Sequence, residues 1–473
     1  MTFSSETSRR SLSVLLTSIS LSLAACDIDK TLAVKDPDVA NPTSLNDVTV
    51  LPTLRTSTIS DLQVAMGAGG EDGVVTEGGL LADELIWAET FPTRGEMDQR
   101  NTNPINGTLS AIYNSLQRAR ATADRTAAAY YKLTPTANLL PRSEVQAMAA
   151  FTYILLAEMY CNGVPVSDFD VNAGTFKLGT PQTGVQLLTT ALAKLDSARA
   201  GVDSTVAANA QVLNLIRVGR GRALLNLNRP SDAAAAVAAV PTSFKYTLFH
   251  SENTGRQNNG IFLPTLNFPR FSVATSEGAN GLRFRLDSSD ARVYAPRGRG
   301  LAFSPSVGAD NLTPMFVQTK YSSRSANFSF ADGVEARLIE AENLARTGGA
   351  YIGTLNALRA SLPTLLTNTP GPSTLLLNAP TVTATSLPAL TAPATQADQV
   401  SQVFQERAYW LFLTGHRLGD LRRLIKHLNR PAESVFPSGA YFKGGTYGVD
   451  VNYPVPFQET NNPNFTQCLD RNP

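Results

Sequence analysis

Residues suited to holding a sugar or a peptide gather in one short segment of the chain. Trp87 is one of only two tryptophans, and it lies in a stretch that contains Gly and Pro and shows little helical periodicity. Aromatic rings stack on the faces of carbohydrates, while Asn and Arg side chains hydrogen-bond to hydroxyl groups. We therefore predict a ligand-binding segment that comprises Trp87, Phe91, Arg94, Arg100 and Asn101.

The same segment also has a structural interpretation, in which Trp87 covers the adjacent helix and the arginines are solvated. Sequence alone leaves both interpretations open, because burial of the tryptophan depends on the fold. Aromatic residues in other parts of the chain are further ligand candidates: Phe268, Tyr294 and Tyr441.

A second set of reactive side chains lies near the C-terminus. It consists of Glu406, Arg407, His416, Arg417, Asp420, Arg422 and Arg423. Carboxylate, imidazole and guanidinium groups together can bind an acidic substrate or transfer protons. Mixed charges also form structural hydrogen-bond networks, and we expect this set to dock the last long helix onto the irregular C-terminal tail. Trp410, in the apolar run beside it, is expected in the core.

Metal, cofactor and catalytic sites find little support. The chain has three histidines, and His416 and His427 are eleven residues apart without a Cys or acidic partner at metal-ligand spacing. The carboxylate pairs at 71–72 and 83–84 have the residue types of glycosidase acids, although any long chain offers such pairs. The Gly-rich stretch 67–79 lacks the Lys-Ser/Thr of a phosphate-binding loop. We predict no metal, no cofactor and no catalytic residue.

Composition narrows the class of protein. The 473 residues are 43% hydrophobic and 17% charged, and 40 basic residues against 39 acidic ones give a net charge of +1. The hydrophobic content supports a sizeable core and excludes a disordered chain. A nearly neutral chain argues against nucleic-acid binding, which needs a basic face, and against electrostatic attachment to a membrane surface.

The first residues predict a targeting segment. Two arginines precede the uncharged apolar stretch Leu12–Ala25, which is shorter than the ~20 residues that span a bilayer. The stretch ends in Leu23-Ala24-Ala25-Cys26, which resembles the lipobox of bacterial lipoproteins. We predict a signal peptide over 1–25 and lipidation of Cys26; an ordinary signal peptide cut after Ala25 is the alternative. Asp27 leaves sorting between the inner and outer membrane open.

The secondary-structure elements that would position these residues are predicted to be mainly helical. Apolar residues recur at helical spacing over 106–131, 141–160, 183–200 and 206–227. Ser231 is predicted to cap a short Ala-rich helix, and residues 330–360 repeat the helix–turn–helix plan, which is typical of tetratricopeptide pairs. A single long helix is expected over 399–428.

Breaks in this pattern divide the chain into regions. A helical region spans 26–243, and residues 244–329 form a loop-rich subdomain of short aromatic runs. The C-terminal region 330–473 contains a low-complexity insertion over 363–397. The predicted fold is mainly α: a scaffold of tetratricopeptide-type helix pairs, an inserted loop-rich subdomain and an irregular C-terminal tail.

Three segments carry a family resemblance. The first ends in Ala157-Glu158-Met159-Tyr160-Cys161-Asn162-Gly163-Val164-Pro165. The second runs from Glu406-Arg407 to Thr414-Gly415-His416-Arg417-Leu418-Gly419-Asp420-Leu421-Arg422-Arg423. The third is Tyr453-Pro454-Val455-Pro456-Phe457-Gln458-Glu459, followed by Asn462-Pro463-Asn464. In order and spacing they resemble the SusD/RagB family of outer-membrane nutrient-binding lipoproteins.

The chain also departs from the family pattern. Gln467-Cys468 replaces the usual closing Gln-Asn, and the Thr/Pro-rich insertion has no counterpart. The region 50–106 matches poorly, although family members often carry ligand contacts there.

The resemblance implies a SusD-like fold and a function in nutrient uptake. A lipid-anchored protein would lie on the exterior of the outer membrane and capture an oligosaccharide or a peptide. It would deliver this ligand to a TonB-dependent, SusC-like transporter without making or breaking bonds. Two alternatives are a tetratricopeptide lipoprotein that acts as an assembly scaffold without a small ligand, and a surface hydrolase.

The two remaining cysteines are predicted to pair. If Cys26 is lipidated, Cys161 and Cys468 form an even pair in an oxidising compartment. A tail without a helix of its own frays unless something fixes it, so a disulfide between Cys161 and Cys468 would anchor it. The alternative is two free thiols.

Overall fold

The computed structural model describes residues 47–67, 69–70, 72–170, 173–285, 290–298, 306–366, 385–466, 468 and 471. The chain divides into the units Met1–Asp47 and Val48–Pro473, and the fold below is that of the second unit. The predicted signal peptide 1–25, Cys26 and most of the low-complexity insertion 363–397 lie outside the described residues.

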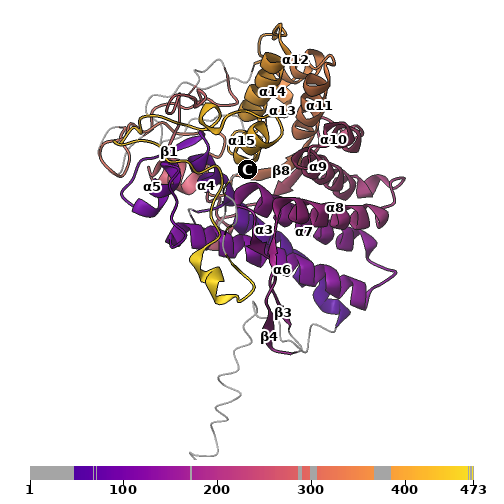
Figure 1. Cartoon of the computed structure of the whole chain (residues 1–473). Coiled ribbons are helices and arrows are strands. Elements are labelled where there is room, and N and C mark those ends of the chain that lie inside the picture. The colour runs from indigo at the N-terminus through magenta and orange to yellow at the C-terminus, as the bar shows by residue number, and fades with distance from the viewer. Residues whose placement is uncertain are drawn as a thin grey trace, which may run out of the picture. The chain divides into compact units, whose positions relative to one another are not determined.

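The first half of this unit is a series of helices, each packed on the next (Figure 1). They are α3 (Leu51–Gly67), α6 (Gly107–Leu133), α7 (Leu139–Met159), α8 (Gly184–Ala200) and α9 (Ala210–Asn226). Helix α7 packs on α3, α6, α8 and α9. Nearly all of its residues are buried, so it is the central helix of this half.

Local sequence explains where these helices begin. The side chain of Asn106 accepts a hydrogen bond from the Leu109 N–H and caps α6. Thr183 and Gln186 form a reciprocal capping box at the start of α8. The predicted helices over these segments are therefore confirmed. The predicted cap at Ser231 is wrong, because the next helix begins one residue earlier with Pro230 in its first turn, where a missing N–H costs nothing.

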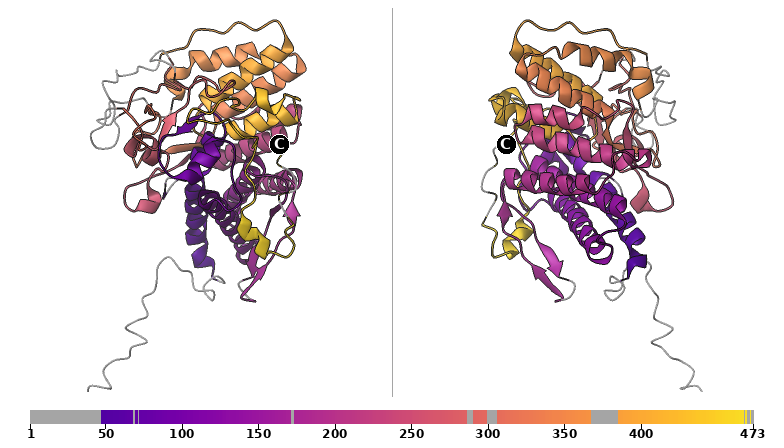
Figure 2. Two further views of the ribbon diagram at one scale, coloured as in Figure 1. Left: turned by 60° about the vertical axis from the view of Figure 1, so that its left-hand side comes forward. Right: turned by 90° about the vertical axis from the view of Figure 1, so that its right-hand side faces the viewer.

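The second half repeats the helix-pair plan (Figure 2). Its helices are α10 (Pro230–Val237), α11 (Gly333–Thr347), α12 (Ile352–Ala360), α13 (Leu362–Leu365) and α14 (Gln396–Trp410). Helix α10 packs on α9 and α11, and α11 packs on α12 and α14. The predicted scaffold of tetratricopeptide-type helix pairs is confirmed.

The helix predicted over 399–428 is not continuous. Helix α14 ends at Trp410, and α15 (Arg417–Lys426) begins after a tight reversal. Within the reversal Leu413 and Gly415 have φ angles of +52° and +75°. The Glu84 side chain accepts a hydrogen bond from the Leu413 N–H at 2.8 Å. A long-range tertiary contact therefore stabilises a break that apolar periodicity does not reveal.

The region 72–98, whose Trp87 segment shows little helical periodicity in the sequence, contains three short elements. They are α4 (Val74–Leu81), β1 (Leu85–Trp87) and α5 (Pro92–Asp98). Strand β1 pairs antiparallel with β7 (Phe271–Val273), and Trp87 lies opposite Phe271. This pairing brings the loop-rich residues 244–329 beside the N-terminal region (Figure 1).

The remaining strands form three two-stranded antiparallel sheets. They pair β2 (Val164–Pro165) with β5 (Pro181–Gln182), β3 (Asp168–Asp170) with β4 (Thr175–Lys177), and β6 (Lys245–Leu248) with β8 (Phe328–Asp332). Short 3-10 or π turns occur at Val48–Val50, Ala207–Asn209, Gly255–Gln257, Leu263–Asn267, Ala432–Ser434 and Phe457–Asn461.

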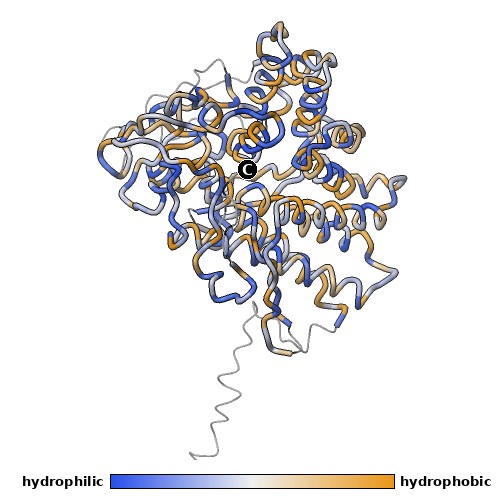
Figure 3. The backbone as a smooth tube through the Cα atoms, viewed as in Figure 1, coloured by the Kyte–Doolittle hydropathy of each residue, from blue (hydrophilic) through white to orange (hydrophobic). Residues whose placement is uncertain are grey.

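Two apolar clusters hold these elements together. The main cluster lies beneath α3 to α9 and extends into the loop-rich region, where Phe271 and Phe284 are fully buried. A smaller cluster fills the space between α11, α12 and α14. Along the helices the backbone alternates between hydrophobic and hydrophilic residues, as expected where one face is buried (Figure 3). Within the described ranges, no helix has the length and apolar character needed to cross a bilayer.

Candidate functional site

Four aromatic side chains and two cations form a surface where β1, β7 and a C-terminal loop meet. We call it the aromatic platform: Trp87, Phe91, Phe268, Arg270, Phe442 and Lys443. Three of its rings are accessible, since Phe91, Phe268 and Phe442 are 51%, 36% and 44% exposed. Large exposed aromatic rings on one surface are unusual for a soluble domain and indicate a binding surface.

Cation–ring contacts connect the platform residues. The Arg270 guanidinium lies 5.3 Å from the Phe91 ring centroid and 5.6 Å from that of Phe268. The Lys443 ammonium lies 3.7 Å from the Trp87 centroid and 5.7 Å from that of Phe442. The Ala88 N–H donates to the Arg270 carbonyl at 2.7 Å, which joins the two halves.

Trp87 is half-buried because α5 and a C-terminal loop both contact its ring. A Cβ atom on Gly95 would come within 3.0 Å of the indole, so a glycine is needed for α5 to lie this close. Lys443, above the ring, pairs with Asp310 at 2.7 Å. A ligand that stacks on Trp87 must therefore displace Lys443, whereas Phe91 and Phe268 are already accessible.

Arg94 lies beneath the platform. Its side chain is 7% exposed and pairs with Asp72 and Glu89, each at 2.7 Å. The guanidinium is also within 5.5 Å of the Phe91 centroid. Arg94 therefore supports Phe91 from below, while its own charge is already balanced.

Arg100 and Asn101 lie apart from the platform. Arg100 is fully buried, and its Nε donates to the Asp450 carbonyl at 2.8 Å. Its guanidinium also donates to the Pro437 carbonyl and covers the Phe436 ring. Asn101 is exposed beside the same C-terminal loop. The structure thus brings together Trp87, Phe91 and Arg94 of the predicted set and uses Arg100 to fix the C-terminal loop.

Of the further aromatic candidates, Phe268 belongs to the platform, whereas Tyr294 and Tyr441 are buried. The sequence analysis missed Arg270, Phe442 and Lys443. Phe442 and Lys443 precede Gly444-Gly445, a turn signal that marks an exposed loop tip. No local signal places this loop against Trp87, because more than three hundred residues separate them.

A pair of buried carboxyl groups lies directly under the platform. Asp98 accepts hydrogen bonds from the Tyr441 hydroxyl at 2.6 Å and from the Trp87 N–H at 3.1 Å. Glu277 accepts from the Tyr447 hydroxyl at 2.7 Å. The two acids influence each other's pKa. Asp98 Oδ1 and Glu277 Oε2 are buried and have no hydrogen-bond partner among the described residues. A proton shared between these two oxygens would give each of them a hydrogen-bond partner.

Burial raises the pKa of Asp98 to about 7. Burial and the Asp98 charge raise the pKa of Glu277 well above its usual value. The folded protein therefore binds more protons than the unfolded chain between about pH 4 and pH 7, and its free energy of unfolding decreases as pH rises through that range. Above this range an ionised Asp98 lies beside Glu277 and the tyrosines that hold the C-terminal loop.

The Asp98→Asn variant tests this shared proton. Its amide N–H would replace the proton, while its carbonyl would still accept from Tyr441. Between about pH 5 and about pH 8, we expect the wild type to lose more free energy of unfolding than the variant, as measured by urea denaturation. Parallel pH profiles for the two proteins would show that the pair holds no proton.

The charged cluster at 406–423 is a structural network between helices. Arg222 of α9 pairs with Glu158 of α7 at 2.6 Å, and the His416 Nε2 lies 3.1 Å from Glu335 of α11. Arg417 pairs with Asp83 through two bonds. The expectation that the cluster docks onto the C-terminal tail is therefore wrong: it joins α14 and α15 to α7, α9, α11 and the segment after α4.

The reversal between α14 and α15 makes part of this network possible. Arg407 and Asp420, which one continuous helix would separate, bond at 2.8 and 2.9 Å. Burial would raise the pKa of Asp420, but Arg407 and Arg423 hold it below its usual value. Arg292 and Arg359 both pair with Glu406 at 2.7 Å. Trp410 is buried in the smaller apolar cluster, as expected.

The remaining acidic and histidine side chains considered as site residues also bond to groups within the protein. Glu84 is buried and accepts from Leu413, and burial raises its pKa to about 8. His250 bonds to Gln63, and burial lowers the pKa of His427, which contacts the Asn226 carbonyl, to about 4. Among the described residues, no group of three or more His, Cys, Asp or Glu side chains could hold a metal ion.

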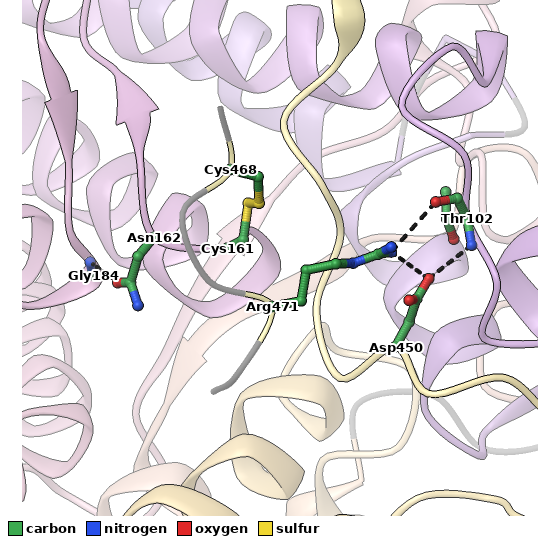
Figure 4. Close-up of a disulfide and its surroundings, with 7 residues drawn as sticks. All are labelled: Thr102, Cys161, Asn162, Gly184, Asp450, Cys468 and Arg471. Atoms are coloured by element: carbon green, nitrogen blue, oxygen red, sulfur yellow. Dashed lines mark hydrogen bonds and ion pairs between the residues drawn. A yellow bond between two sulfur atoms is a disulfide. The ribbon is translucent and has the colours of Figure 1, made fainter. Parts of the chain in front are cut away.

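The C-terminal tail is fixed near the end of α7 (Figure 4). A disulfide joins Cys161 to Cys468, whose Cα atoms are 5.9 Å apart, a normal separation for this bond. The Tyr453 N–H donates to the Met159 carbonyl at 2.8 Å. Arg471 pairs with Asp450 at 2.5 Å, beyond the disulfide.

Comparisons with known proteins give a structural match without a sequence match. No family model matches the chain, and no curated protein matches it. A SusD-like carbohydrate-binding protein from Bacteroides fragilis superposes with a TM-score of 0.61 at 16% identity, covering 90% of this chain and 100% of that one.

Two proteins from Bacteroides thetaiotaomicron match to a similar degree. A SusD/RagB family protein gives a TM-score of 0.61 at 14% identity, covering 86% of this chain and 94% of its own. Surface glycan-binding protein A gives 0.61 at 12% identity, covering 90% of this chain and 100% of its own. Agreement over nearly the whole length shows that the chain has the SusD-like fold.

Proposed function

We propose that the protein captures a glycan on the aromatic platform and belongs functionally to the SusD/RagB nutrient-binding lipoproteins. The observation that carries this proposal is the set of accessible rings at Phe91, Phe268 and Phe442 beside Trp87. Rings of this kind offer flat apolar surface to sugar faces without requiring a deep pocket. Similar structures include proteins described as carbohydrate-binding and surface glycan-binding. A peptide is the alternative ligand of the same surface.

The proposed setting is the exterior of the outer membrane. Lipid on Cys26 would anchor the protein, and several acyl chains at about 0.8 kcal/mol per buried methylene would hold it firmly. A TonB-dependent, SusC-like transporter would receive the ligand. In this scheme the protein contributes affinity, and the transporter contributes energy-coupled passage.

The proposal includes no bond-breaking step. Hydrolysis of a glycosidic bond needs two carboxyl groups that flank the substrate. Asp83 is fully buried and bonded to Arg417, and Glu84 is buried beside it. The Asp98 and Glu277 pair is also buried, beneath Tyr441 and Tyr447. These carboxyl groups would have to be uncovered before they could reach a sugar.

A scaffold for protein assembly is the alternative function. The helix pairs favour it, since such repeats commonly bind proteins. The accessible rings and their paired cations favour a small ligand instead, because they lie on the loop side of the molecule and not on a helix face.

Two measurements on the native protein test the proposal. Electrophoresis through gels that contain plant, microbial or host polysaccharides should show retention by at least one glycan, with soluble peptides as the parallel screen. Purification from detergent-solubilised outer membranes should recover a large β-barrel transporter. Recovery of assembly machinery, with no glycan or peptide retained, would favour the scaffold. Release of a Cys26→Ser variant from the membrane would support the lipid anchor.

A further inference from the structure

Two half-buried arginines beside the aromatic platform lie against one aromatic ring. Arg285 and Arg297 lie 4.1 Å and 4.8 Å from the centroid of one ring, that of Phe316. Within the described part of the chain, neither guanidinium has an ion-pair partner. Among the described residues, the one hydrogen bond that the Arg297 side chain donates goes to the Ser306 carbonyl, at 2.9 Å. The buried Nε of Arg285 has no hydrogen-bond partner among the described residues.

The contrast with the platform itself is sharp. Both platform cations and the arginine beneath them have a carboxylate: Arg270 lies 3.6 Å from Glu89, Lys443 lies 2.7 Å from Asp310, and Arg94 pairs with Asp72 and Glu89. Two unmatched guanidinium groups on one ring repel each other. Burial and the Arg297 charge lower the pKa of Arg285, and the smaller influence of Glu277 raises it. A bound anion would relieve this repulsion and fill the unused donors.

The backbone places this arginine pair next to the platform. Strand β7, which carries Phe271 opposite Trp87, bonds to the next segment through Val273 N–H and the Phe316 carbonyl at 2.8 Å. Arg297 lies directly opposite Phe316 on the following segment. With about 4.8 Å between neighbouring strands, Arg297 lies about 10 Å from β7. An oligosaccharide of a few units can span that distance.

We propose that Arg285 and Arg297 form an oxyanion site, supported by Phe316, that takes a sulfate or carboxylate group of the captured glycan. Arginine forks match both oxyanions through paired N–H donors, and the ring beneath keeps the two guanidinium groups oriented. The inference deepens the proposed function and rests on it for the identity of the ligand. It assigns the ligand to the acidic polysaccharides.

The test uses three polymers with one backbone: dextran, carboxymethyl dextran and dextran sulfate, in affinity electrophoresis of the full-length protein. Wild type should be retained by at least one acidic polymer, with affinity that falls as NaCl rises. The R285Q/R297Q variant should lose affinity by about tenfold or more, because each charged hydrogen bond contributes that much. The single variant R297Q should lose part of the affinity for the acidic polymer. It replaces the double variant in this test if the double variant unfolds.

A matched control separates this site from general polyanion attraction. Arg118 and Arg324 are exposed arginines elsewhere, without ion pairs among the described residues, so R118Q/R324Q removes the same charge and should retain wild-type affinity. Equal retention of R285Q/R297Q and this control would overturn the inference. If the protein binds only neutral glycans, and R285Q/R297Q binds them equally well, the oxyanion site is overturned. The proposed function in glycan capture would still stand.

Inorganic sulfate tests the site apart from any glycan. Millimolar sodium sulfate should raise the Tm of wild type above that in NaCl of equal ionic strength. The same addition should leave R285Q/R297Q unchanged. A sulfate effect that needs both arginines, with no polysaccharide retained, would support the oxyanion site and contradict glycan capture. Equal Tm shifts in both proteins would contradict the site.

Discussion

Replacing Asp420 with Ala should reduce the free energy of unfolding by about 3–5 kcal/mol, because it leaves two buried guanidinium groups short of a counter-charge. Arg407 bonds to Asp420 at 2.8 and 2.9 Å, and Arg423 pairs with it at 2.9 Å. All three side chains are at most 4% exposed. Among the described residues, Glu342 would then be the one carboxylate that pairs with both arginines. Urea denaturation measures the loss.

The matched control is Asp232→Ala on α10. Asp232 pairs with Arg229 at 2.7 Å, and both side chains are 54% exposed. An exposed pair contributes at most about 1 kcal/mol, so this variant should remain close to wild type. Similar small losses in both variants would show that water reaches the Asp420 network and that it does not fasten α15 to α11 and α14.

Removal of the disulfide should have the second large effect. The bond links residues 307 positions apart. Constraining a loop of that length in the unfolded chain stabilises the fold by up to about 5–6 kcal/mol in the chain-entropy model, although native disulfides usually give about 2–5 kcal/mol. The Cys161→Ser/Cys468→Ser variant should be less stable than oxidised wild type by an amount in this range. Limited proteolysis should cut its tail faster.

Reduction provides the internal control. Dithiothreitol should bring the stability of wild type close to that of the double-Ser variant and leave the variant unchanged. Mass spectrometry of unreduced peptides should recover residues 161 and 468 in one cross-linked species. Alkylation of both thiols in the exported protein, with no effect of dithiothreitol, would mean that packing and hydrogen bonds alone hold the tail.

Apolar periodicity predicted most of the helical scaffold, whereas the one predicted cap, at Ser231, is wrong. Asn106 and Thr183 mark helix starts because their side chains satisfy N–H groups of the first turn. The break at Leu413 to Gly415 could not be predicted, since Glu84, more than three hundred residues away, stabilises it. The stretch 72–98 was missed for a similar reason: β1 exists because β7 pairs with it.

The candidate site was only partly predictable. Trp87 stands out as one of two tryptophans, Phe91 as an aromatic residue on the same helix-poor segment, and Phe268 as an aromatic residue on a loop. Whether an arginine faces a ligand or a carboxylate depends on long-range packing, so Arg100 gives no sign in the sequence that it bonds to the Asp450 and Pro437 carbonyls. For the same reason the roles of Lys443, Arg285 and Arg297 could not be predicted. Their contacts depend on residues that only the folded structure brings close.

The central claim, that a glycan binds on the aromatic platform, can be measured through Trp87 itself. Trp87 and Trp410 are the two tryptophans of the chain. The buried Nε1 of Trp410 has no hydrogen-bond partner among the described residues, so Trp410→Phe should fold normally and leave Trp87 as the one indole fluorophore. Titration of this variant with a retained glycan should give a saturable change in emission, with the Kd found by calorimetry.

In the same background, Phe91→Ala/Phe268→Ala should weaken binding by about fivefold or more, since each lost stacking contact is worth about 0.5–1.5 kcal/mol. Its free energy of unfolding should change less than for a buried Phe, because Phe91 and Phe268 are 51% and 36% exposed. Calorimetric binding of the glycan with unchanged Trp87 emission, and with equal affinity in the Phe91→Ala/Phe268→Ala protein, would place the ligand elsewhere and contradict the account.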